Sequence, residues 1–197
     1  MALEYTPTLG PVEAAEAGRT CGEDAVSELA HDTALVRAAR EGDRGAFGRL
    51  YERFAPMVHG LLLARVRPAE VDDLVQDVFL QAMRRLASLR SLEAFPPWLA
   101  AIARNRARDH HRRARDTVEL PPGLEGAAPP DAEALAVLAA VRRLPEAYRE
   151  TLVLRLVEGM TGPEIAARTG LTPGSVRVNL HRGVQMLRQI LRGEERR

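Results

Sequence analysis

Apolar residues recur every three or four positions along most of the chain, which is the spacing of one face of an α-helix. The pattern begins after Asp32, a candidate N-cap, and continues to an arginine-rich segment that ends at Arg115. It resumes at residue 133 and continues to residue 193. No alternation of apolar and polar residues is long enough to indicate a β-strand. The pattern therefore predicts an all-α protein, with helices over residues 32–54 (interrupted at 42–45), 58–66, 71–86, 96–115, 134–144, 146–157, 163–169 and 173–191.

Composition divides the chain further. Residues 116–132 contain four prolines, two glycines and four acids but no base, a composition typical of a flexible linker. The first 31 residues mix prolines and glycines with scattered acids and show no sustained period, so we expect a mobile arm there. We therefore predict two small helical domains joined by a flexible acidic linker: arm 1–31, domain 32–115, linker 116–132 and domain 133–193.

Closely spaced helix signals mark the C-terminal domain. Glu164 follows Thr161 at the spacing of a capping box, and Gly170 stands where the first helix should end. Thr172 then precedes Pro173, a residue that the first turn of a helix tolerates. Two helices joined by so short a turn predict a helix-turn-helix, whose second helix presents polar side chains to a DNA major groove. A helical hairpin with a solvated polar face is the alternative.

Charge is balanced in total but segregated along the chain. There are 28 basic and 27 acidic residues, a net charge of +1. Six arginines stand between residues 104 and 115 against one acid, whereas residues 70–77 hold four acids and no base. This segregation indicates different partners for different surfaces. Every basic residue is arginine, which suits phosphate and guanine contacts, although a GC-rich genome gives the same bias.

Other residues predict little chemistry. A single cysteine, Cys21, cannot form an internal disulfide, and no apolar run of about 20 residues could span a bilayer, so we expect a cytoplasmic protein without membrane contact. Asp72, Asp73 and Asp77 could be metal ligands, but such sites usually draw ligands from more than one element. We expect no cofactor, no metal and no catalytic activity.

Three segments in order carry a resemblance to a known family. They are "DDLVQDVFLQAMRRL" (72–86), "WLAAIARNRARDHHRR" (98–113) and the C-terminal stretch 144–191, which contains "PEIAARTGLTPGSVRVNLHRG". Together they resemble bacterial sigma factors of the extracytoplasmic-function group, within the sigma-70 family. The resemblance implies a promoter-specificity subunit that binds core RNA polymerase, recognises the minus-35 and minus-ten elements and helps to melt DNA. An anti-sigma factor is a further expected partner.

The resemblance also implies roles for individual residues. Helix 71–86 would dock on the clamp helices of the largest polymerase subunit, and the C-terminal domain would contact the flap. The polymerase contacts would be Asp73, Gln76 and Asp77. The minus-ten contacts would be Leu89, Arg90, Arg104, Asn105, Arg108, Arg112 and Arg113. The minus-35 contacts would be Ser175, Arg177, Val178, Asn179, His181 and Arg182.

Two other classes of protein remain open at the level of sequence. A stand-alone helix-turn-helix regulator would bind duplex DNA without polymerase. An enzyme such as a recombinase would need a nucleophile, a base and a phosphate clamp, and no such cluster is apparent in residues 32–115.

Overall fold

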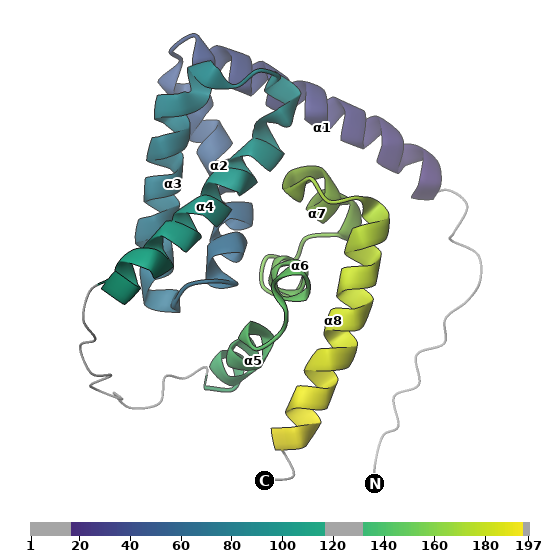
Figure 1. The fold of residues 1–197 in the computed structure, drawn as a ribbon. Coiled ribbons are helices and arrows are strands. Elements are labelled where there is room, and N and C mark those ends of the chain that lie inside the picture. The colour runs from purple at the N-terminus through teal and green to yellow at the C-terminus, as the bar shows by residue number, and fades with distance from the viewer. Residues whose placement is uncertain (1–16, 117–131, 195–197) are drawn as a thin grey trace, which may run out of the picture.

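The computed structural model describes residues 17–116 and 132–194, which contain eight α-helices and no β-strand (Figure 1). The predicted all-α fold is confirmed. None of the described helices combines the length and apolar character that a membrane span requires. The N-terminal bundle consists of α1 (Ala17–Arg40), α2 (Arg44–Leu63), α3 (Val71–Arg85) and α4 (Phe95–Asp116). The C-terminal bundle consists of α5 (Ala132–Arg142), α6 (Glu146–Leu156), α7 (Gly162–Thr169) and α8 (Pro173–Glu194).

Helix α2 is the centre of the N-terminal bundle, since α1, α3 and α4 all pack against it. Its start is fixed by Asp43, whose side chain accepts hydrogen bonds from the backbone N–H groups of Gly45 (2.8 Å) and Ala46 (3.0 Å). In the core, the buried rings of Phe54 and Phe95 meet with centroids 5.4 Å apart. This ring contact joins α2 to the first residue of α4, the helix that carries the arginines.

The predicted capping signals of the helix-turn-helix are present. Thr161 and Glu164 form the capping box: the Thr161 N–H donates to Glu164 Oε2 (2.7 Å), and the Glu164 N–H donates to Thr161 Oγ1 (3.4 Å). Gly170 ends α7 with φ +79°, a left-handed conformation that glycine adopts without strain. The Ser175 N–H then donates to Thr172 Oγ1 (3.1 Å) at the start of α8. The break between the two helices is thus fixed at both ends, as the sequence predicts.

The inner face of α8 packs as expected. Val176 is buried where α7 and α8 cross, and the small side chain of Ala166 is buried there too. Further along α8, Gly183 faces α6 so closely that a Cβ atom would lie 2.9 Å from Leu152 Cδ1. This glycine lets α8 lie directly on α6.

The structure differs from the prediction at the N-terminus. Helix α1 begins at Ala17, so residues 17–31 of the predicted mobile arm are helical. Its first half lacks an apolar stripe, and the side chains of Leu29 and Ala30 are exposed. Periodicity therefore does not report this part of the helix. Residues 1–16 and the predicted linker between α4 and α5 lie outside the described residues.

The two bundles are in direct contact. Helix α6 packs on α2, and α7 packs on α4, so that α6 and α7 lie beside the N-terminal bundle (Figure 1). The guanidinium of Arg168 on α7 lies 5.7 Å from the centroid of the Phe54 ring. The sequence leaves the relative placement of the two bundles open, and the structure closes one against the other.

The capping box predicts a measurable contribution to stability. Thr161→Ala removes the hydroxyl that accepts from the Glu164 N–H, and we expect it to lower the free energy of unfolding by about 1 kcal/mol. Chemical denaturation followed by circular dichroism measures this loss. Thr161→Ser keeps the hydroxyl and should unfold near the wild type; equal stability of all three proteins would contradict the capping role.

Candidate nucleic-acid and polymerase interface

The leading turns of α8 present a polar surface. Arg177, Val178, His181 and Arg182 are exposed, whereas Asn179 is half-buried. Because Val176 and Leu187 face the core, the arginines and His181 are left on the outer side of the helix. Side chains of this kind can reach base edges and phosphates in a major groove.

Two of the predicted minus-35 residues have local partners, which lie just before α8 for Ser175 and within α8 for His181. The Ser175 hydroxyl lies 2.8 Å from Thr172 Oγ1, so it takes part in the cap as well as facing outward. His181 Nε2 lies 3.0 Å from Gln185 Nε2 one turn later. Gln185 is exposed beside the predicted residues.

The arginine-rich helix α4 has two kinds of arginine. Arg108 is exposed and donates to Asn105 Oδ1 (2.5 Å), and Arg112 is exposed and donates to Asp109 (3.1 Å). Arg104 instead turns towards the C-terminal bundle and donates to Glu150 Oε1 (2.5 Å). The structure therefore keeps Asn105, Arg108, Arg112 and Arg113 on an exposed face, while Arg104 is engaged.

The loop between α3 and α4 separates its two predicted minus-ten residues. Arg90 is exposed, but Leu89 is only 5% exposed and belongs to the hydrophobic core. The sequence could not show that one of them is buried and the other exposed, because both follow the last turn of α3, where no periodic pattern continues. The Leu89 side chain holds the loop against the bundle, whereas Arg90 points outward.

The three predicted polymerase contacts on α3 are not equivalent. Asp73 and Gln76 are exposed. Asp77 is half-buried and forms an ion pair with Arg106 of α4, so it also ties α3 to α4. This bond fixes the acidic helix relative to the arginine-rich helix.

An apolar hollow adjoins Gln76. It has a volume of about 250 Å³, and three of its lining side chains are large, apolar and exposed: Tyr51 (38%), Leu80 (48%) and Met83 (49%). Sequence analysis missed this surface. The signal was present, since Leu80 and Met83 lie three residues apart on α3 and outside its buried stripe.

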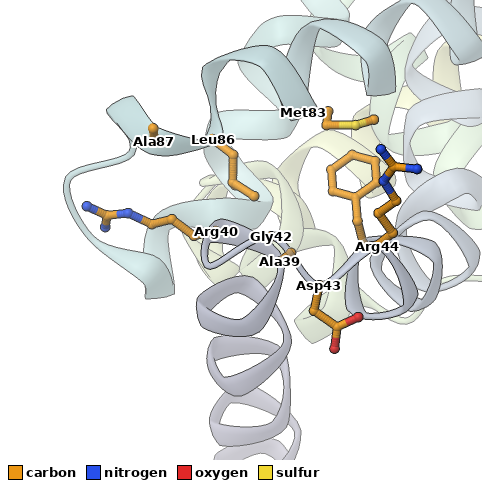
Figure 2. A pocket seen from close by; sticks show the side chains of 9 residues that line it. Ala39, Arg40, Gly42, Asp43, Arg44, Met83, Leu86 and Ala87 are labelled. Carbon is orange, nitrogen blue, oxygen red and sulfur yellow. The ribbon is translucent and has the colours of Figure 1, made fainter.

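A second, larger hollow of about 650 Å³ lies between the α1–α2 turn and the end of α3. Figure 2 shows Leu86 reaching from the end of α3 towards the turn at Gly42, with Arg40 and Arg44 at opposite ends. The two hollows share Phe47 and Met83 as lining residues. Together they make this side of the bundle largely apolar, with Arg40, Asp43 and Arg44 lining the larger hollow. No cluster of His, Cys, Asp or Glu in the described part of the chain could hold a metal ion.

Family comparisons assign both bundles. The sigma-70 region 2 model matches residues 50–117, and a sigma-70 region 4 model matches residues 134–187. The fold and the two family models thus define a two-region sigma protein, in which region 2 ends with the arginine-rich helix and region 4 contains the helix-turn-helix.

Similar proteins that align with most of this chain identify the group of sigma factors to which it is related. The chain is 37% identical to the RNA polymerase sigma factor CarQ of Myxococcus xanthus, over 77% of this chain and 92% of the relative. It is 33% identical to the extracytoplasmic-function sigma factor BldN of Streptomyces coelicolor, over 86% of this chain and 69% of the relative. Among solved structures, CnrH in complex with the cytosolic domain of CnrY matches with a TM-score of 0.60 and 28% identity, over 82% of this chain and 97% of that chain.

The chain therefore belongs to the extracytoplasmic-function group of RNA polymerase sigma factors, within the sigma-70 family. It is a promoter-recognising subunit of RNA polymerase. A stand-alone regulator is not favoured, because both sigma regions are present in one chain.

Proposed function

We propose that α8 reads the minus-35 element, that α4 and the loop before it engage the minus-ten element, and that α3 docks on core polymerase. The exposed polar face of α8 is the observation that supports this assignment. Val176 and Leu187 pack inward, so Arg177, His181 and Arg182 face outward. Ser175, Val178 and Asn179 border that face and complete the proposed contacts.

For the minus-ten element, the exposed face of α4 supplies the contacts. Asn105 can hydrogen-bond a base of the separated strand, and Arg108, Arg112 and Arg113 can hold its phosphates. Arg90 adds a positive charge at the loop, while Leu89 anchors that loop from the core. Arg104 joins this set once it is released from Glu150.

For the polymerase, we propose a contact with a polar edge and an apolar centre. Asp73 and Gln76 offer oxygen acceptors to a basic helical surface, and the adjoining hollow offers Leu80 and Met83 as apolar anchors. Exposed apolar side chains beside polar ones are typical of binding sites. Asp77 has a positioning role through Arg106.

The partners and location follow from this role. Catalysis of RNA synthesis belongs to the polymerase, so we expect no enzymatic activity of this chain alone, and we expect it in the cytoplasm, where polymerase and DNA are found. An anti-sigma factor is a further proposed partner, since CnrH was solved with the cytosolic domain of CnrY.

Run-off transcription with core polymerase tests the function as a whole. Added sigma should give promoter-dependent product from at least one of a panel of candidate promoters, and it should bind core polymerase. Absence of both results would reject the proposal, and tight binding to duplex DNA without polymerase would favour a regulator instead.

A first set of variants tests minus-35 recognition. Arg177→Ala and Arg182→Ala should each weaken upstream binding by the holoenzyme by ~1–3 kcal/mol if each guanidinium contacts a guanine through two hydrogen bonds. Quantitative footprinting measures the change. Arg188→Ala is the matched control, because Arg188 is an exposed arginine further along the same helix. Unchanged upstream protection in both test variants would reject the assignment.

A second set tests polymerase docking. Asp73→Arg and Met83→Ala should each raise the Kd for core polymerase about tenfold or more, which is ~1.4 kcal/mol. Fluorescence anisotropy of labelled sigma measures the Kd, and circular dichroism checks the fold. Glu52→Arg reverses an exposed charge on α2 outside both hollows and should bind normally. Loss of binding in this control alone would place the docking surface elsewhere.

A further inference from the structure

The leading turns of α8 carry one exposed apolar side chain among polar ones. Val178 is 46% exposed, and of the large apolar side chains that are exposed within the described residues it is the one on α8. Arg177 precedes it, and His181 and Arg182 follow one turn later, all three of them exposed. An isolated valine is ordinary on a protein surface, so its exposure alone indicates no function. Its position on the helix and its neighbours distinguish it.

Val178 points directly away from the hydrophobic core. It lies about two and a half turns before Leu187, so the two side chains are on opposite sides of the helix. Leu187 is buried, as is Val176, which is also on the inner side. Because α6 and α7 cover that inner side, Val178 lies on the side that a DNA groove would meet.

The surface beside Val178 is open. Gly174 is exposed and lies one turn earlier, on the same side of the helix. A Cβ atom on Gly174 would meet only the hydroxyl of Thr172, at 4.0 Å, and Gly174 does not have a positive φ. Neither packing within the described residues nor backbone conformation therefore requires a glycine there. The bare backbone leaves Val178 accessible to a surface that approaches from the leading end of the helix.

Valine is suited to a fixed apolar contact. Its β-branched side chain adopts mainly one rotamer in a helix, so both methyl groups are held in place before any partner binds. Little side-chain freedom is then lost when the contact forms. An exposed helix position that meets only water is better filled by alanine, glutamate or arginine, which have a higher helix propensity.

The base edges in a major groove offer such a side chain one matching group, the 5-methyl group of thymine. The edges of guanine, adenine and cytosine present hydrogen-bond donors and acceptors instead. Valine can pair with none of these, and covering them removes them from water without a new partner. An apolar side chain at this place therefore favours thymine over the other three bases.

We propose that Val178 is a specificity-determining residue that reads a thymine of the minus-35 element through its 5-methyl group. The inference rests on the proposed function, because it concerns the same recognition helix. Arg177 and Arg182 supply contacts to phosphates and guanine, whereas Val178 selects a pyrimidine by apolar contact. The proposal names one kind of base that the upstream element must contain.

Deoxyuridine tests the contact by the smallest possible change, because it pairs with adenine as thymine does and lacks only the methyl group. Core polymerase is assembled with the full-length chain, and a promoter that gives run-off product is prepared with each upstream thymine, on either strand, replaced in turn by deoxyuridine. Competition binding measures the Kd of the wild-type holoenzyme for each duplex. We expect one position at which loss of the methyl group raises the Kd ~3–5-fold, as the burial of one methyl-sized group implies.

A double-mutant cycle assigns the contact to Val178. Val178→Ser removes both methyl groups at an exposed site, so the fold should be kept, which circular dichroism checks. This variant should bind the thymine duplex ~3–5-fold more weakly than the wild type and should not distinguish thymine from deoxyuridine at that position. Val178→Ile keeps a β-branched apolar side chain and should retain the discrimination.

The chain offers a matched control in a second exposed valine of the same bundle. Val157 follows the last residue of α6 and is 52% exposed, so Val157→Ser makes the same chemical change away from the recognition helix. The Val157→Ser holoenzyme should respond to deoxyuridine as the wild type does.

Three results would overturn the proposal. They are an upstream element without thymine on either strand, no weakening of wild-type binding at any deoxyuridine position, and a weakening that persists in Val178→Ser. The last result would assign the methyl group to another residue or to the shape of the DNA. Run-off product from the unmodified promoter is measured first: its absence refutes the proposed function, whereas product together with any of the three results refutes only the reading of thymine by Val178.

Discussion

The arrangement of the two bundles depends on the buried carboxylate of Glu150, whose burial would be unfavourable without a positive partner. Moving one charge out of water costs several kcal/mol, and Glu150 is stabilised only because Arg65 and Arg104 accompany it. An ionic contact of this kind adds little stability relative to an apolar one, but it requires a precise geometry. It also dissociates into groups that water solvates well. Charge therefore fixes where the bundles meet, while buried apolar side chains such as Leu154, beside Gly60, add apolar contact across the same interface.

The arginines of α4 show how one charged segment serves both structure and recognition. Arg106 ties α4 to α3 through Asp77, and Arg104 ties α4 to α6 through Glu150. Within the described residues, Arg108 bonds to Asn105 and to the Arg104 backbone oxygen, and Arg112 bonds to Asp109, all on the same helix. These arginines can exchange such partners for phosphates at small cost. The structural charges of α4 thus point to two sides of the helix, Arg106 towards α3 and Arg104 towards α6, while Arg108 and Arg112, the proposed DNA contacts, are exposed.

The local parts of this structure could be predicted from the sequence, and the distant contacts could not. Thr161, Glu164 and Gly170 specify the helix-turn-helix because each acts on groups within a few residues. Arg104 and Arg108 look alike in the sequence, since the partner that distinguishes them is Glu150, which lies 46 residues beyond Arg104. In the same way, nothing local tells that Leu89 is buried, whereas the apolar stripe of α3 already leaves Leu80 outside it. Periodicity locates the face of a helix, but only the packed fold decides which neighbours cover it.

Gly60 imposes an asymmetry on how the inter-bundle contact can change during evolution. The contact depends on the absence of a side chain, so every other amino acid at this position adds bulk against Glu158 and Leu154. A lost ion pair at Glu150 can be compensated by a second change elsewhere in the charge network. The notch at Gly60 can be recreated only by shortening Glu158 or Leu154 on the facing bundle, because no residue is smaller than glycine. A change at this position alone therefore moves α6 away from α2, so a lineage that keeps the two bundles in contact keeps the glycine or shortens a facing side chain with it.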